Sequence, residues 1–122
     1  MAKTVVHYTP AQNVTVKAQA AVDAGSFVEI AGNVDGRNPV VKAAAAGATP
    51  FGVVAHDVEA GGHVMVYRAG HIVEVAASGS IAAGDSVAVA ANGKAAKAAE
   101  GAAVAGLAVS AVSDGFVQVA LA

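Results

Sequence analysis

The stretch of sequence that decides the fold is NVTVKAQAAVDAGSFVEIA, residues 13–31, because residues 72–90, IVEVAASGSIAAGDSVAVA, repeat its pattern 59 positions later. The positions that agree are small apolar residues and a turn glycine. They are Val14, Val16, Val22, Gly25 and Val28 in the first stretch and Val73, Val75, Ile81, Gly84 and Val87 in the second. A long internal period of this kind is the signature of a duplicated architecture.

The repeat continues beyond the next loop at a spacing of 54 and then 53 residues. The matching positions are Gly47, Gly52, Val58, Gly61, Val64 and Val66 in the first copy and Gly101, Gly106, Val112, Gly115, Val117 and Val119 in the second. The loop Gly32–Arg37 of the first copy is longer than its counterpart around Asn92-Gly93, which explains the shorter spacing. We therefore expect this loop to make contacts that only the first copy makes.

Each copy has the pattern of a run of short β-strands separated by glycine-rich turns. Valines alternate with other residues, which is typical of half-buried strands. The Asn92-Gly93 pair predicts a tight type I′ hairpin, because both residues tolerate positive φ. We expect strands near residues 13–19, 26–31, 38–43, 51–57 and 63–68 in the first copy and near 71–77, 86–91, 94–98, 105–111 and 116–121 in the second.

These patterns predict an all-β fold, a compact β-barrel or sandwich built from an internal duplication with pseudo-two-fold symmetry. Two copies favour a closed domain over a solenoid, which generally needs three or more. We expect an extended N-terminal arm over residues 1–12 and a single β-domain over 13–122, with copies at about 13–69 and 72–122. Residues 94–100 are rich in helix formers but align with a strand, so strand and helix both remain open there.

Composition excludes several classes of function. The 122 residues carry a net charge of −2 with no basic cluster, so we expect no nucleic-acid partner. No apolar run is long enough for a membrane span or a signal peptide, and the absence of cysteine excludes disulfides and thiolate metal sites. Because only 13% of the residues are charged, we expect partner subunits to cover part of the surface.

The residues that could carry chemistry form no recognised site. His56, Asp57, His63 and Glu74 match no standard metal-ligand spacing. The serines flank turns, and neither a nucleophile elbow nor a phosphate-binding loop is present. We therefore predict no catalytic, cofactor-binding or metal residues, no small-molecule substrate and no enzymatic activity. Lys94, just after a hairpin turn, leaves a biotinyl or lipoyl carrier domain as an alternative, although the usual sequence context of such a lysine is absent.

Three segments carry a resemblance to a known family. They are KAAAAGATPFGVV at residues 42–54, the Val-x-Ala-Gly-Gly-x-Val-x-Val pattern at residues 58–66, and GHIVEV at residues 70–75. Together they resemble a family of small tailed-phage proteins, long catalogued as a domain of unknown function and regarded as capsid cement or decoration proteins. The resemblance covers about residues 12–122, and Thr-Pro-Phe-Gly-Val is its most specific segment.

The resemblance implies a non-enzymatic structural protein that binds the outside of an expanded icosahedral capsid and stabilises it. It further implies a homotrimer at three-fold and quasi-three-fold positions, with the major capsid protein as partner. The protein would be made in the cytoplasm of the bacterial host and end on the outer capsid surface of the virion. A β-rich component of a phage tail or baseplate is the alternative.

The interface with the capsid or with neighbouring subunits is expected in two places. One is the arm, whose apolar and aromatic groups favour ordering on a neighbour. The other is the long loop of the first copy. The residues are Thr4, Val5, Val6, His7 and Tyr8 in the arm and Asn33, Asp35 and Arg37 in the loop.

Overall fold

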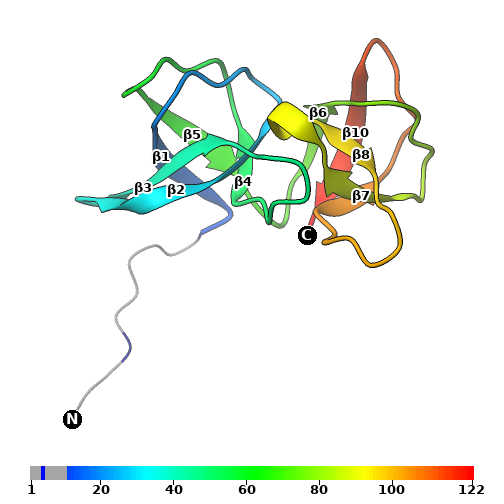
Figure 1. The fold of residues 1–122 in the computed structure, drawn as a ribbon, viewed down its shortest axis with the longest axis horizontal. Helices are drawn as coiled ribbons and strands as arrows, with labels where there is room; N and C mark the ends of the chain where they lie inside the picture. The colour runs from blue at the N-terminus through cyan, green and yellow to red at the C-terminus, as the bar shows by residue number, and fades with distance from the viewer. Residues whose placement is uncertain (1–3, 5–10) are drawn as a thin grey trace.

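The computed structural model describes residue 4 and residues 11–122, which form two five-stranded β-sheets side by side (Figure 1). The first sheet is a closed barrel with strand order β1-β3-β2-β4-β5, and the second has the order β6-β10-β9-β7-β8. The strands are β1 (Asn13–Ala18), β2 (Phe27–Asp35), β3 (Asn38–Ala43), β4 (Gly52–Val54), β5 (His63–Tyr67), β6 (Ile72–Ala76), β7 (Ser86–Val89), β8 (Ala95–Lys97), β9 (Gly106–Ala108) and β10 (Phe116–Leu121). The predicted all-β class with a barrel is confirmed.

The duplication is visible in the backbone pairing of the two sheets. The barrel closes through parallel pairing of β1 with β3, which includes Ala18↔Val41. In the second sheet the equivalent positions form the single parallel bridge Ala77↔Ala95. The hydrogen bonds that follow are Gln19 N–H to Val41 O and Ser78 N–H to Ala95 O, both 2.7 Å long. The second sheet thus repeats the strand order of the first, with one bridge in place of the closing ladder.

The segment expected to be a loop in the first copy is a strand extension. β2 does not stop at residue 31 but runs to Asp35, so the hairpin with β3 forms a long ribbon that projects from the barrel (Figure 1). The inserted residues continue to pair, as in Gly32↔Val40 and Asp35↔Asn38, with shifts of register on either side of Gly32. An insertion that keeps its cross-strand partners lengthens a ribbon, and bulges of this kind absorb the extra residues.

The ambiguous segment 94–100 contains a strand, β8, preceded by a 3-10 turn at Ala91–Gly93. Asn92 and Gly93 both have positive φ, 59° and 71°, as the predicted hairpin requires. Gly93 is also sterically required, because a Cβ there would collide with the backbone carbonyl oxygen of Phe27. The Asn92-Gly93 turn of the second copy therefore packs against the start of β2 in the first copy.

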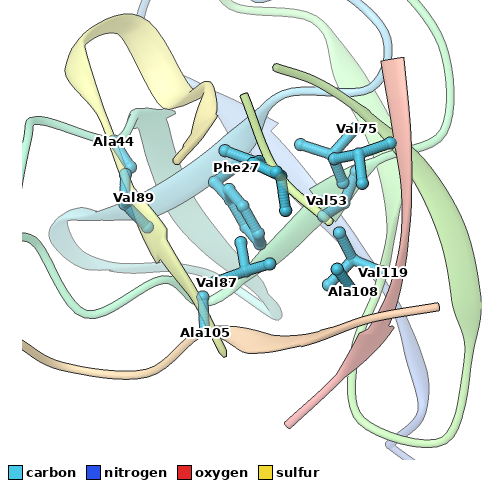
Figure 2. Packing of buried hydrophobic residues seen from close by; sticks show 12 residues of the cluster. Phe27, Ala44, Val53, Val75, Val87, Val89, Ala105, Ala108 and Val119 are labelled. Carbon is cyan, nitrogen blue, oxygen red and sulfur yellow. The ribbon is translucent and has the colours of Figure 1, made fainter. Parts of the chain in front are cut away.

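The core falls into two clusters of buried side chains. One fills the first barrel and consists of valines from the first copy alone, including Val16, Val28 and Val66. The other lies within the second sheet, and Phe27, Ala44 and Val53 of the first copy are part of it. Figure 2 shows the Phe27 ring among Val75, Val87 and Val119. The first copy therefore supplies side chains to the core of the second.

The second copy needs side chains from the first because its own core side chains are smaller. Three positions that carry larger residues inside or against the first cluster carry alanine in the second. The pairs are Val41 and Ala95, Phe51 and Ala105, and Val54 and Ala108. Interiors pack to nearly uniform density, so the missing volume must come from elsewhere. Phe27, which is fully buried, provides it, whereas its counterpart Ser86 is exposed.

Backbone hydrogen bonds fix the two copies against each other beside this contact. Their donors and acceptors are Ala76 N–H to Gly25 O (2.9 Å), Gly47 N–H to Val89 O (2.9 Å) and Gly93 N–H to Ala44 O (2.8 Å). Each joins a turn of one copy to a strand or turn of the other. Combined with the shared core, these bonds make the two copies a single packed unit.

Candidate interaction surfaces

Exposed large hydrophobic side chains gather on the outward face of the second sheet. Ile72 on β6 is 63% exposed and Leu107 on β9 is 48% exposed, and Ala120 on β10 stands between them in register. Val109 and Phe116 are also exposed on this face, where the polar pair Glu74 and Gln118 lies between Phe116 and the row. We call Ile72, Leu107, Val109 and Phe116 the apolar face. Exposed large apolar side chains gathered on one face make it a candidate interaction site.

The equivalent face of the first sheet is different in chemistry. At three outward positions the second copy has an apolar residue and the first has a polar or charged one. The equivalent pairs are Asn13 and Ile72, Lys17 and Ala76, and His63 and Phe116. The two copies share a backbone, so the architecture does not dictate the difference. Ile72 and Phe116 are therefore the members of the apolar face that only the second copy has.

A groove separates the apolar face from the first barrel. It has a volume of about 560 Å³ and runs beside β6, with Ile72, Glu74 and Phe116 on one side and Val53 and Tyr67 on the other. The Tyr67 ring contacts the His71 ring at a centroid distance of 5.0 Å, and His71 Nδ1 lies 3.1 Å from the carbonyl oxygen of Arg68. These contacts hold the barrel side of the groove in place. The groove is predominantly apolar, and Glu74 is the acidic residue among those that line it.

The β2–β3 ribbon exposes a second set of apolar side chains at the opposite end of the molecule (Figure 1). Ile30 is 50% exposed and Val34 is 59% exposed. Lys17 Nζ donates a hydrogen bond of 2.7 Å to the Asp35 carboxylate beside them. This hydrogen bond, together with the positive charge of Lys17, holds the pKa of Asp35 below its ordinary value. The ion pair anchors the ribbon to β1.

The ribbon tip gathers three of the residues expected at an interface. Asn33, Asp35 and Arg37 all lie at or next to the turn and are exposed. Thr4 in the arm is exposed as well, and Val5, Val6, His7 and Tyr8 lie outside the described residues.

The apolar face and the groove were missed by sequence reasoning. The aligned copies carried a usable signal: a polar residue in one copy and a large apolar residue in the other at the same outward position, as in Asn13 and Ile72. Reading that signal requires knowing which face of each strand points outward, and neighbouring residues such as Val73 and Val75 made the whole segment look like core.

The residues considered for chemistry remain separate. Within residue 4 and residues 11–122, no three potential metal ligands come together. His56 Nδ1 lies 2.9 Å from the carbonyl oxygen of Asp57, a local contact of a turn. Lys94 follows the hairpin turn and lines a second groove with Asn92 and Asp23. No helix in the described part of the chain is long and apolar enough to cross a membrane.

Comparison with known proteins identifies the family of the chain and a solved structure with the same fold. The solved structure of the head fiber gp8.5 N base in bacteriophage phi29 has the same fold, with a TM-score of 0.74 and 24% sequence identity over 90% of this chain and 92% of that one. No curated protein sequence matches the chain. The sequence model of the phage cement protein family matches residues 6–122. The chain therefore belongs to the phage cement proteins and is a structural protein of the phage capsid.

Proposed function

We propose that this protein is a decoration protein that binds the outside of the expanded capsid and stabilises it, as a homotrimer at three-fold and quasi-three-fold positions. The match of the cement protein family over residues 6–122 carries the proposal. The proposal includes the major capsid protein as partner, the outer surface of the virion as location, and a role without catalysis, cofactor or metal.

Two further observations support this function. The apolar face and the exposed ribbon give a small protein more than one surface for contacts with neighbours, as a subunit that covers seams between other subunits requires. The head fiber with the same fold is a component of a phage head, which favours a head position over a tail or baseplate position for this chain.

Stabilisation would follow from mass action. A ligand that binds the expanded shell but not its precursor or its separated subunits shifts the equilibrium toward the expanded shell. A trimer that contacts several capsid subunits at once would add avidity, because each further contact forms at a high effective concentration. The rigid union of the two copies through Phe27 suits this role, since a preorganised binder loses little conformational freedom on docking.

The N-terminal arm is the proposed contact with the shell. Its residues Thr4, Val5, Val6, His7 and Tyr8 combine β-branched and aromatic side chains, which favour extended structure. We propose that this arm adds a strand to an exposed sheet edge of a capsid subunit, where backbone hydrogen bonds provide affinity and alternate side chains provide specificity.

Co-sedimentation of the purified chain with phage shells that lack it tests the proposal. Expanded shells should bind the chain saturably, and unexpanded shells should not. Bound chain should also raise the temperature at which expanded shells fall apart. Absence of binding to expanded shells of the matched phage would refute the decoration role.

A truncated chain lacking residues 2–9 tests the arm separately. Its circular dichroism and unfolding midpoint should match those of the full chain, because the barrel begins at Asn13. Its binding to expanded shells should be lost. Undiminished binding of the truncated chain would exclude the arm as the shell contact and leave the decoration role standing.

A further inference from the structure

We propose that Asn92 is a deamidation site that the packing of the two copies against each other keeps closed. The side-chain amide of Asn92 is lost when this packing opens, and the altered turn cannot then return to its place. The inference goes beyond the decoration role and does not rest on it, because it concerns the chain alone.

Asparagine followed by glycine is the dipeptide in which deamidation is chemically easiest. The backbone nitrogen of Gly93 attacks the Cγ carbon of the Asn92 side chain and forms a new C–N bond, and its proton leaves with Nδ2 as ammonia. Water then opens the resulting succinimide ring at one of its two C–N bonds, which gives aspartate or isoaspartate. Because glycine has no Cβ, its nitrogen reaches the carbonyl carbon without steric hindrance.

Asn92 is the asparagine of this chain whose sequence neighbour best permits the reaction. Asn13 and Asn33 are followed by valine, whose branched Cβ shields the attacking nitrogen, and Asn38 is followed by proline, which has no backbone N–H. The Asn92 side chain is exposed and forms no hydrogen bond with another described residue. The amide itself is therefore unprotected, and protection has to come from the backbone.

The backbone of Asn92 directs the attacking nitrogen away from the side chain. The succinimide ring closes only when Gly93 N lies on the same side of the Asn92 Cα–C bond as Cβ. At the observed ψ of 33°, the chirality of an L-residue places Gly93 N almost opposite Cβ. The reaction therefore requires a large rotation of the peptide between Asn92 and Gly93 about this bond.

Contacts between the two copies prevent that rotation. Gly93 N–H donates a hydrogen bond of 2.8 Å to Ala44 O, so the first copy engages the attacking nitrogen. Gly93 is buried, and the backbone of Phe27 fills the space that a Cβ at Gly93 would need. The turn lies where the two sheets meet (Figure 1). Gly93 N can approach the Asn92 side chain only after the turn has moved away from β2.

Deamidation would keep the copies from packing again in the same way. Isoaspartate adds one methylene group to the main chain at position 92, directly before a glycine that has no room for an extra atom. Ala44, which is fully buried, would then lose the N–H partner of its carbonyl oxygen. A buried carbonyl without a partner is destabilising, so the modified turn favours the open form.

The rate of deamidation at Asn92 tests the proposal. Peptide mapping by mass spectrometry measures loss of the amide, and enzymatic methylation of the same peptides detects isoaspartate. The folded chain is compared with a synthetic peptide of residues 89–96 at the same mildly alkaline pH and temperature. The folded chain should react at least about tenfold more slowly, because a reaction through a rare open form is slowed by the small population of that form. In guanidinium chloride that unfolds the chain, the rate should rise to that of the peptide.

Asp35→Asn provides a matched turn in the same molecule. It places an asparagine before Gly36 in the ribbon turn, where φ is +64° and no atom lies within 4 Å of an added Cβ. The new asparagine should react at close to the rate of the peptide, while Asn92 of the same chain stays protected. The difference isolates the packing of the two copies from the effect of a hairpin turn.

Phe27→Ala loosens the packing from the other side. Removing the shared core side chain should accelerate deamidation of Asn92 by at least about tenfold, because it raises the population of the open form. Ser86→Ala, at the equivalent exposed position, should leave the rate unchanged. Circular dichroism checks that both variants fold.

Three results would overturn the proposal. The first is a folded chain that loses the Asn92 amide as fast as the peptide. The second is equal protection of the new asparagine in Asp35→Asn, which would mean that any hairpin turn suffices. The third is a folded Phe27→Ala chain that reacts no faster than the wild-type chain. If Phe27→Ala does not fold, the comparison of the two turns in Asp35→Asn still decides.

The lasting effect is tested on chain that has been deamidated while unfolded and then returned to buffer. Its unfolding midpoint should be lower than that of chain held only briefly in the same denaturant. An unchanged midpoint would contradict the claim that the modified turn cannot return to its place.

Discussion

The two copies of the repeat have the same strand order, but only the second copy needs side chains from the other to fill its core. The first closes as a barrel around its own valines. The second has alanine at Ala95, Ala105 and Ala108 and completes its interior with Phe27 from the first. After duplication, therefore, one copy has become a scaffold and the other is completed by it. From this dependence we expect the two sheets to unfold together.

The outward faces of the two sheets also differ, and here it is the second copy that carries the larger apolar side chains. The first copy, with the self-sufficient core, presents Asn13, Lys17 and His63 to solvent, and the second presents the apolar face around Ile72 and Phe116. Once the backbone is fixed by duplication, outward positions are free to specialise without loss of stability. The comparison of the copies therefore separates residues kept for folding from residues available for contacts.

Removing the shared side chain should have the largest effect. Phe27→Ala should lower the free energy of unfolding by about 3–5 kcal/mol, because it leaves a cavity in the core of the second copy. Denaturant unfolding measures the loss. Ser86→Ala, at the equivalent exposed position, should change little. Equal effects of the two substitutions would contradict the idea that one copy completes the other.

The equivalent hairpin turns should also differ. Gly93→Ala should cost about 3 kcal/mol, because a left-handed conformation is combined with a collision against the Phe27 backbone. Gly36→Ala at the ribbon turn, where φ is +64° and no atom lies within 4 Å of the added Cβ, should cost about 1 kcal/mol. Thermal unfolding of both variants checks the difference, and similar losses would indicate that the turn of the second copy is not packed against the first.

A further prediction concerns a core position at which the first copy has valine and the second has alanine. Ala95→Val, which introduces the residue found at Val41, should destabilise the wild-type chain by about 1–3 kcal/mol through overpacking. In the Phe27→Ala background the same substitution should cost less or stabilise, since it fills part of the cavity. A double-mutant cycle measures this coupling. Additive effects would show that the two side chains do not share space.

The smallest effect concerns the ion pair of the ribbon. Lys17→Met should raise the pKa of Asp35 toward 3.8, its ordinary value, because methionine supplies neither the hydrogen bond nor the charge that lower it. A carboxylate with a lowered folded-state pKa contributes stability above its unfolded pKa and loses that contribution as the pH falls through the folded one. Titration by carbon-detected NMR checks the shift. Because Asp35 is exposed, the change in unfolding free energy at neutral pH should be minor.

The sequence predicted the strands well because valine alternation and paired glycines repeat in both copies. Ranges such as 38–43 and 116–121 agree with β3 and β10. The ribbon was wrongly expected to be a loop, since Gly32-Asn33 and Asp35-Gly36 carry turn residues. Cross-strand pairing with β3 overrides that local preference.

The candidate site was predicted only in part. Asn33, Asp35 and Arg37 were expected at an interface because the insertion is specific to one copy, and they do come together at the ribbon tip. The burial of Phe27 and the exposure of Ile72 could not be predicted from the sequence, for a physical reason. Both are apolar residues at strand ends, and only the packing of one sheet against the other makes Phe27 fully buried and leaves Ile72 exposed.

Imaging of expanded heads after addition of the purified chain tests the central claim most directly. We expect added density on the outer surface at the three-fold and quasi-three-fold positions, with three copies around each axis. Saturated binding elsewhere on the shell, or bare three-fold positions in the presence of excess chain, would contradict it.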